Sequence, residues 1–343
     1  MWLQPDVWKN LPVLPLVTAI ICLGGCTNQP TEEQLEIWRN EAIARNAEIV
    51  ADNAKKNQPM ESNLVIQGET ATGKSVKFNW QQVGVLANTY VQTTDPNYVI
   101  DRNQVFNFRG LPISKLLKEF GHQSNVTEVT FLSDDAYQIT VSLADLLTYP
   151  IILAIANNGK PINRDQGGPI YLVFPYRQYP EIKQKYDESF WAFYVSNMIV
   201  GTEKVQLRVG KRTLNLAALD QLPQVTLTET VGYRIGWPSG KVKLHGVRVR
   251  DVLSLAGVQL PTLGEVVVRG KAQVYRSTAN PMSFSAADLR ECEILLVTRW
   301  GEDKQLIPAK LGGPVTLAFS SECKTKTSNI RWVTFVEELI IQP

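Results

Sequence analysis

Histidine and cysteine are scarce in this sequence of 343 residues, which contains two histidines (His122 and His245) and four cysteines. No Cys-x-x-Cys pair occurs, so a zinc site built from a cysteine and histidine array is excluded. The motifs G-x-G-x-x-G, H-E-x-x-H and G-x-S-x-G are also missing. Their absence argues against a Rossmann dinucleotide-binding protein, a zincin protease and an α/β-hydrolase.

An excess of charge of one sign is missing too, because 35 Lys and Arg residues balance 33 Asp and Glu residues. Without a basic field the chain is not expected to bind nucleic acid. Hydrophobic residues make up 44% and charged residues 20%, which is typical of a folded protein rather than a disordered one. The length favours about two domains.

One match to the phosphate-loop pattern G-x-x-x-x-G-K-[ST] occurs, from Gly68 to Ser75. A true phosphate loop leads from a strand into a helix. The residues that follow this match alternate between polar and apolar side chains as far as Trp80, which is typical of a strand. The sequence therefore predicts a β-hairpin with a glycine-containing turn rather than a nucleotide site.

The N-terminus carries an apolar run over residues 11–23, shorter than the roughly 20 residues that a membrane-spanning helix needs. The run ends in Leu23-Gly-Gly-Cys26, which resembles the bacterial lipobox, whose cysteine is lipidated and becomes the mature N-terminus. We expect a signal peptide over residues 1–25 and a lipoprotein anchored to a bacterial membrane, extracytoplasmic, in the periplasm or on the outer face. An uncleaved membrane anchor is the alternative.

Residues 26–59 follow as a lipid-anchored Cys26 and a spacer. Thr31 and Gln34 form a capping-box pattern, and residues 32–56 contain neither proline nor glycine, which predicts a spacer helix. In an oxidising compartment, with Cys26 acylated, Cys292 and Cys323 remain as an even pair. They either form a disulfide or stay as two buried thiols.

The rest of the chain shows internal similarity. Four blocks recur in the same order: 108–121 with 244–257, 142–146 with 285–289, 167–174 with 312–319, and 191–200 with 332–341. We therefore expect two tandem domains, 60–201 and 202–343. Each is predicted to be α+β with mixed sheets, from a glycine turn before a short helix and strands such as 129–132, 151–156, 170–174 and 190–200.

Each copy resembles the molybdopterin-binding domain of the sulfite oxidase family. The segments that carry the resemblance are Phe108-Arg-Gly-Leu, Ser133-Asp-Asp-Ala-Tyr137, 153–162, 165–175 and 330–336. The resemblance implies two sulfite oxidase-like folds after the spacer helix. It also implies the activity of a molybdopterin-dependent oxidoreductase, by oxygen-atom transfer or sulfoxide-type reduction.

The sequence departs from that family at its cofactor residues. The family's metal-binding cysteine precedes the aromatic-x-Gly segment, but neither 91–107 nor 227–243 contains a cysteine. The family's histidine is Gln166 here, and the arginine that follows it is Tyr171 or Thr316. We therefore expect a degenerate fold without molybdenum or another cofactor. Its role would be to bind a ligand or a partner; the molybdopterin-dependent oxidoreductase is the alternative.

Polar residues in the motif loops are the candidates for a binding groove. These are Arg109, Asp135, Arg164 and His245, and His245 stands where the first copy has Arg109. No metal ligands and no catalytic residues are assigned. The expected partners are the membrane, through the lipid, and an unidentified protein or small molecule. The aromatic segment 171–179 is expected to pack in the core, with an exposed partner patch as the alternative.

Overall fold

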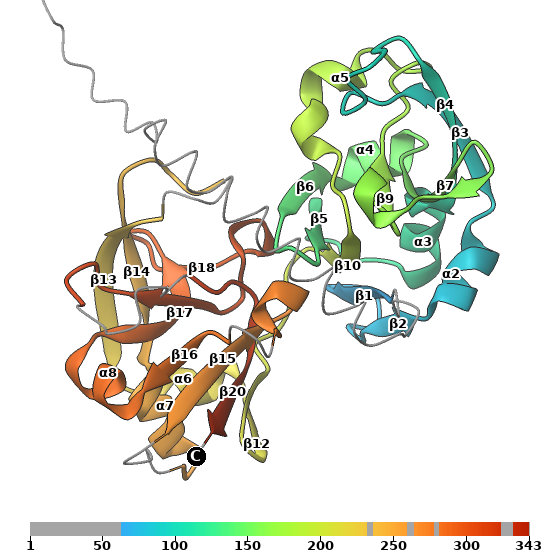
Figure 1. Cartoon of the computed structure of the whole chain (residues 1–343). Coiled ribbons are helices and arrows are strands. Elements are labelled where there is room, and N and C mark those ends of the chain that lie inside the picture. The colour runs from blue at the N-terminus through green and yellow to red at the C-terminus, as the bar shows by residue number, and fades with distance from the viewer. Residues whose placement is uncertain (1–62, 232–235, 259–263, 278–280, 324–331, 343) are drawn as a thin grey trace, which may run out of the picture.

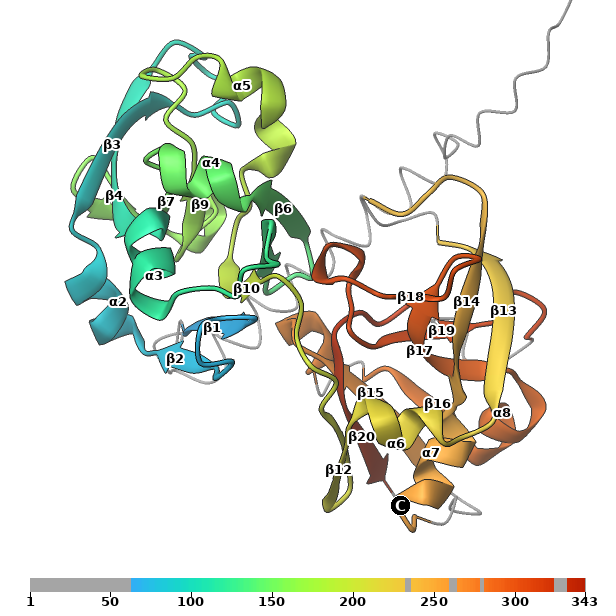
Figure 2. The same ribbon diagram turned by 180° about the vertical axis from the view of Figure 1, so that it is seen from behind.

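The computed structural model describes residues 63–231, 236–258, 264–277, 281–323 and 332–342. Figures 1 and 2 show two lobes side by side, which we call the first half (residues 63–200) and the second half (residues 207–342). The predicted signal peptide, Cys26 and the spacer helix lie outside the described residues. In the part of the chain that is described, no helix has the length and apolar character needed to cross a membrane.

The first half contains two five-stranded sheets. Sheet A has the order β2 (Val76–Phe78), β1 (Leu64–Gly68), β10 (Val195–Val200), β5 (Glu128–Ser133), β6 (Gln138–Ser142). Sheet B has the order β3 (Thr89–Thr94), β4 (Val105–Pro112), β7 (Ile152–Asn157), β8 (Lys160–Pro161), with β9 (Tyr171–Val173) also on β7. The helices are α2 (Trp80–Leu86), α3 (Ile113–Phe120), α4 (Leu143–Thr148), α5 (Ile182–Lys185), η1 (Arg164–Gln166) and η2 (Glu188–Phe190).

The second half has two sheets with the same strand order. Sheet C runs β12 (Arg212–Leu214), β11 (Leu207–Val209), β20 (Val336–Gln342), β15 (Glu265–Gly270), β16 (Ser283–Ser285). Sheet D runs β13 (Gln224–Thr230), β14 (Lys241–Arg248), β17 (Ile294–Trp300), β18 (Gln305–Leu306), with β19 (Thr316–Phe319) also on β17. The helices are α6 (Leu216–Asp220), α7 (Val249–Leu255), α8 (Ala286–Glu291), η3 (Gln273–Tyr275) and η4 (Ala309–Leu311).

Each half therefore combines one mixed sheet, A or C, and one antiparallel sheet, B or D, with short helices, which agrees with the predicted α+β class. In each half one strand pair is parallel, β1 with β10 and β11 with β20, while the other neighbouring strands in sheets A and C are antiparallel. The predicted hairpin is also present, since β1 and β2 pair antiparallel across the turn that contains Gly73 and Lys74. The G-x-x-x-x-G-K-S match is therefore a hairpin turn and not a phosphate loop.

The predicted glycine turn before the first helix is wrong, because this segment is strand β4. Gly110 lies within β4, where an irregularity in the pairing with β7 follows Arg109. A Cβ atom on Gly110 would lie 2.2 Å from the Leu153 carbonyl oxygen, and one on Gly246 would lie 2.2 Å from that of Leu296. Glycine is thus needed here for close approach of two strands. The predicted helices follow directly as α3 and α7.

Repeated serine and aspartate residues start two matching helices. The Ser142 hydroxyl accepts a hydrogen bond from the Asp145 amide at the start of α4, over 3.2 Å. The Ser285 hydroxyl accepts one from the Asp288 amide at the start of α8, over 3.1 Å. Each cap satisfies an amide that a helix terminus would leave unpaired, which explains why the sequence block recurs in both halves.

The predicted strand over residues 190–200 is shorter than expected. Its first part is the end of η2 and an irregular segment, and β10 begins only at Val195. Tyr194 has a φ of 54°, a left-handed conformation that a strand does not allow. Trp191 is nevertheless buried, and so are Tyr171 and Phe174, which confirms core packing for the aromatic segment.

An apolar contact joins the halves. Leu132 and Ile199 from the first half pack with Ala309 and Phe335 from the second, and all four are almost completely buried. The linker between the halves, residues 201–206, is held by Glu69, whose Oε2 atom accepts a hydrogen bond from the Thr202 amide over 2.9 Å. At this interface the β5–β6 turn of the first half lies beside η3 and η4 of the second half.

Candidate functional site

A polar cluster lies at the turn between β5 and β6. Asp134 in this turn contacts Arg164 of η1, with Nη1 3.3 Å from Oδ2. The Arg164 guanidinium carbon lies 4.2 Å from the centroid of the Tyr194 ring, a cation–π arrangement. Asp135 is fixed beside them because its Oδ1 atom accepts a hydrogen bond from the Tyr137 amide over 3.0 Å. We call these four residues, Asp134, Asp135, Arg164 and Tyr194, the Arg164 cluster.

Burial dominates the electrostatics of this cluster. It raises the pKa of Asp134, and the charge of Arg164 offsets only part of that effect. It raises the pKa of Asp135 as well, with a smaller contribution from the charge of Asp134. The Nε and Nη2 atoms of Arg164 are buried and have no hydrogen-bond partner among the described residues. Buried donors of this kind require an acceptor, supplied by water, a ligand or a partner.

The cluster borders the second half. The backbone amide of Val274 in η3 donates a hydrogen bond to the Asp134 carbonyl oxygen over 3.1 Å. The side-chain amide of Gln138 donates to the Lys310 carbonyl oxygen over 2.7 Å. Ala136, from the same turn, packs in the core cluster of the second half. The Arg164 cluster therefore lies where the two halves meet.

A second charged group fixes the linker at this interface. Lys271 lies 3.2 Å from Glu203 of the linker and 2.6 Å from Glu337 at the start of β20, and Arg276 also pairs with Glu337. Burial raises the pKa of Glu203, although Lys271 opposes it. Burial acts the same way on Glu337, but the charges of Lys271 and Arg276 outweigh it and lower the pKa. None of these residues was predicted from the sequence to be functional.

The structure brings together two of the four predicted groove residues, Asp135 and Arg164. Arg109 lies elsewhere, on β4, and its Nη1 atom donates a hydrogen bond to the Ala87 carbonyl oxygen over 2.8 Å. His245 lies on β14 in the second half. The four residues therefore do not line a single groove. Their similar sequence context reflects matching positions in two halves rather than one site.

His245 is engaged by its neighbours on both ring nitrogens. Nε2 lies 2.8 Å from the Gly301 carbonyl oxygen and Nδ1 lies 2.9 Å from the Thr226 hydroxyl. Because a carbonyl oxygen can only accept, Nε2 carries a proton in this arrangement. Asp251, the carboxylate nearest to it in the sequence motif, lies 4.0 Å from Arg250 instead. These contacts indicate that His245 joins strands and turn rather than serving as a catalytic base.

The residues at the family's cofactor position form a different arrangement. In the segment where the family has its cysteine stand Thr93, Asp95 and Asn97. Tyr171 lies at the arginine position, and its hydroxyl is 3.1 Å from Asp95 Oδ1 and 3.0 Å from Asn97 Nδ2. Thr93 is fully buried, and its hydroxyl oxygen accepts a hydrogen bond from the Tyr176 amide. The polar groups of this loop are therefore bound to residues of the protein's own core.

Aromatic rings surround Tyr171. Its ring centroid lies 4.8 Å from that of Phe193, 5.5 Å from that of Trp191 and 6.0 Å from that of Phe108. Burial raises the pKa of Tyr171, and the charge of Asp95 adds to this effect. Tyr171 is therefore a neutral hydrogen-bonding group and cannot replace a cation that binds phosphate. The residues present do not fit a molybdopterin held by a thiolate and an arginine.

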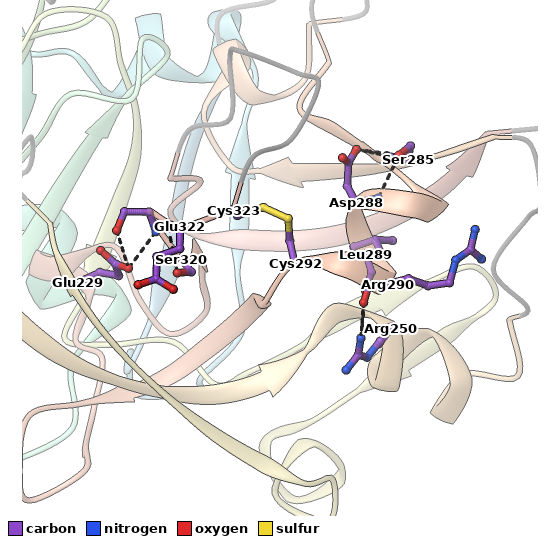
Figure 3. The surroundings of a disulfide bond; sticks show 11 residues. Glu229, Arg250, Ser285, Asp288, Leu289, Arg290, Cys292, Ser320, Glu322 and Cys323 are labelled. Atoms are coloured by element: carbon purple, nitrogen blue, oxygen red, sulfur yellow. Dashed lines mark hydrogen bonds between the residues drawn. A yellow bond between two sulfur atoms is a disulfide. The ribbon is translucent and has the colours of Figure 1, made fainter.

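Cysteine does not supply the missing ligand from elsewhere in the described chain. Cys292 after α8 and Cys323 after β19 are joined in a disulfide with a Cα–Cα distance of 5.3 Å (Figure 3). A sulfur in a disulfide is not a thiolate ligand. Among the described residues, no group of three or more His, Cys, Asp or Glu side chains is arranged to hold a metal ion.

Comparison with known families tests the resemblance. Residues 60–179 match the oxidoreductase molybdopterin binding domain. The match covers about a third of the chain and lies within the first half, where the resemblance is also carried by residues 108–175. It supports the molybdopterin-binding family for this segment. No curated protein matches the chain.

Among solved structures, the sulfane dehydrogenase SoxCD from Paracoccus pantotrophus is similar, with 14% sequence identity and a TM-score of 0.32. The similarity covers 76% of this chain and 64% of that chain. The chain thus spans less than two thirds of the SoxCD chain. At that score the likeness adds nothing to the family match.

Proposed function

We propose that this chain is an extracytoplasmic lipoprotein with two tandem copies of the molybdopterin-domain fold, which bind a ligand or a protein partner without molybdenum. The observation that carries the proposal is Tyr171. It stands where the family has a cation, and its hydroxyl contacts Asp95 and Asn97 of the segment that would supply the thiolate. The Tyr171 ring packs against Trp191 and Phe193, so this position belongs to the aromatic core of the first half.

Two features support the tandem arrangement and the location. Sheets C and D have the strand order of sheets A and B, and Gly110 and Gly246 make the same close approach in each half. Disulfides persist mainly in oxidising compartments, so the Cys292–Cys323 bond supports export. Lipidation at Cys26 rests on the lipobox resemblance, and incorporation of labelled fatty acid, lost in Cys26→Ser, tests it.

Binding is proposed at the interface of the halves, since the Arg164 cluster lies there. Arg164 retains two buried donors without a protein acceptor among the described residues. Interfaces between domains are common places for ligands. A ligand that offers acceptor oxygens to Arg164 would satisfy these donors.

A molybdopterin-dependent oxidoreductase is the second candidate, and the match over residues 60–179 favours it. Metal and pterin analysis of the protein purified from its native membrane separates the two candidates. We expect molybdenum and pterin far below one equivalent per chain. A content near one equivalent per chain would overturn our proposal and establish the redox candidate.

A further inference from the structure

Exposed apolar side chains are concentrated in one stretch of the sequence of the first half, at α2 with the start of β3 and, separately, at the far end of the β3–β4 hairpin. Six of the eight large hydrophobic residues that are exposed in the described chain lie between residues 80 and 105. Three of them belong to α2 and the start of β3: Trp80, Val85 and Tyr90, with exposed fractions of 39%, 76% and 63%. Such clustering on a soluble surface marks an interaction site more often than isolated exposed residues do.

Helix α2 is built to present these side chains outward. It is capped by Asn79, whose side chain accepts a hydrogen bond from the Gln82 amide, and Val83 is its only buried residue. Val83 anchors α2 to the core of the first half, while Trp80 and Val85 remain exposed to solvent. An exposed tryptophan and an exposed aliphatic residue on one short helix suit a membrane interface, where an apolar body and a polar edge are both satisfied.

Lysines surround this apolar surface. Exposed Lys77 lies on β2, and exposed Lys115 and Lys118 lie on α3. Strand β2 is held beside the end of α3, because the Phe78 and Phe120 rings are 5.8 Å apart. The Lys115 ammonium lies 3.5 Å from the side-chain oxygen of Asn88, just after α2.

The same elements carry little negative charge. Glu119 is the one acidic residue within β2, α2 and α3, and Lys74 in the adjoining hairpin turn adds a further exposed cation. The surface is therefore positive around its apolar centre, which complements anionic lipid headgroups.

The chain enters the first half at the same place. Leu64 of β1 pairs with Phe78 of β2, so the residue before β1 lies beside Asn79 and the start of α2. If the lipid is on Cys26, the 37 residues from there to Asn63 reach α2 first. With residues 32–56 helical, as expected, a segment of that length spans on the order of 80 Å, so the tether brings α2 to the membrane without forcing contact.

We propose that the α2 face, defined as Trp80, Val85 and Tyr90 with Lys74, Lys77, Lys115 and Lys118, docks on the surface of an anionic lipid bilayer. The tether argument rests on the lipid anchor of the proposed function, whereas the surface itself does not. Docking would hold the first half against the membrane and turn the second half away from it.

The test places one fluorescent reporter at a time in the full-length protein. Val85→Cys carries an environment-sensitive dye on the α2 face. Ile100→Cys, at the far end of the β3–β4 hairpin, and Leu306→Cys, in the second half, serve as controls at other exposed apolar positions. The added thiol is the one that reacts, because Cys292 and Cys323 are bonded to each other and every reporter chain also carries Cys22→Ser and Cys26→Ser.

Quenching by nitroxide-labelled lipid is then compared in vesicles of phosphatidylcholine alone and with added phosphatidylglycerol. We expect strong quenching at residue 85 in the anionic vesicles, weak quenching in neutral ones, and little at residues 100 and 306. Equal quenching at all three residues, or none at residue 85, would overturn the proposal.

Charge is tested with a triple variant, Lys77→Gln, Lys115→Gln and Lys118→Gln, which should remove more than half of the quenching at residue 85. A matched triple variant of exposed lysines elsewhere, Lys160→Gln, Lys204→Gln and Lys211→Gln, should leave it unchanged. Equal losses in both variants would show that only net charge matters and would contradict a defined docking face.

The unlipidated Cys26→Ser chain separates this proposal from the lipid anchor. If fatty acid is not incorporated into the native protein but residue 85 of Cys26→Ser is still quenched by anionic vesicles, the anchor fails and the docking face stands. If residue 85 is shielded only in native membranes and not in pure lipid vesicles, the occupant is a membrane protein and the docking proposal is wrong.

Discussion

The Lys271 ammonium lies 3.2 Å from the Glu203 carboxylate, so a residue that follows β15 holds the linker between the two halves. Glu337 completes the group at 2.6 Å from the same ammonium. The side chain of Lys271 is only 10% exposed, and its charge is therefore compensated by these neighbours rather than by water.

Replacement of Lys271 should be severely destabilising. Lys271→Met leaves two carboxylates at the interface without their shared cation, and we expect a loss of about 3–5 kcal/mol in the free energy of unfolding. Lys310→Met is the matched control, because Lys310 pairs with Glu128 at 3.1 Å across the same interface but is about half exposed. The control should lose less than about 1 kcal/mol. Chemical denaturation measures both, and similar losses would contradict a special role for Lys271.

Acid should remove the contribution of Glu337. Its pKa is lowered in the folded protein from an ordinary value of 4.5, so the stabilisation is complete above that value and is lost as the pH falls through the folded pKa. The difference in unfolding free energy between the protein and Glu337→Gln should therefore be constant near neutral pH and shrink below pH 4.5. A difference that does not change with pH would show that the ionised carboxylate is not the stabilising form.

Alanine at Gly110 should disrupt the pairing of β4 with β7. The added Cβ would meet the Leu153 carbonyl oxygen at 2.2 Å, and the two strands would have to separate. We expect a loss of more than about 2 kcal/mol in thermal or chemical denaturation. Gly84→Ala in α2 is the control, since nothing lies within 4 Å of its Cβ position. It should raise helix stability by up to about 1 kcal/mol.

Removal of the Tyr171 hydroxyl should destabilise the first half. In Tyr171→Phe, half-buried Asp95 and exposed Asn97 lose their shared hydrogen-bond partner, at a cost of about 0.5–1.5 kcal/mol. Tyr90→Phe changes an exposed ring and should be neutral. If Tyr171→Phe is as stable as the parent, the hydroxyl contacts do not hold the loop, and the argument against a cofactor at this place weakens.

Loss of the disulfide should lower the stability of the second half. The bond joins residues 31 positions apart, and removing it with Cys292→Ser and Cys323→Ser should cost about 2–4 kcal/mol. The parent protein in reductant should show the same lower denaturation midpoint, and the double variant should not respond to reductant. A parent midpoint that reductant leaves unchanged would show that the bond is absent in solution.

Local patterns predicted the local structure well. The alternation after Ser75 indicated the hairpin, and the repeated blocks 108–121 and 244–257 indicated the short helices α3 and α7. The glycine turn at residue 110 was wrong because glycine serves both turns and close strand contacts. The close strand contact of Gly110 is with Leu153, which is distant in the sequence, so the local pattern could not distinguish it from a turn.

Contacts between distant residues could not be predicted in the same way. Arg164 was a candidate groove residue, but its pairing with Asp134 across 30 positions depends on how η1 packs against the β5–β6 turn. Lys271 and Glu203 belong to no repeated motif, so the sequence contained no pattern that marked them.

The apolar contact of Leu132 and Ile199 with Ala309 and Phe335 also affects how the gene can be divided. Cutting the linker to express the first half alone would leave two aliphatic side chains on the outer surface of sheet A without cover. Such a fragment would tend to self-associate, and its behaviour would reflect the missing neighbour rather than the properties of the fold itself.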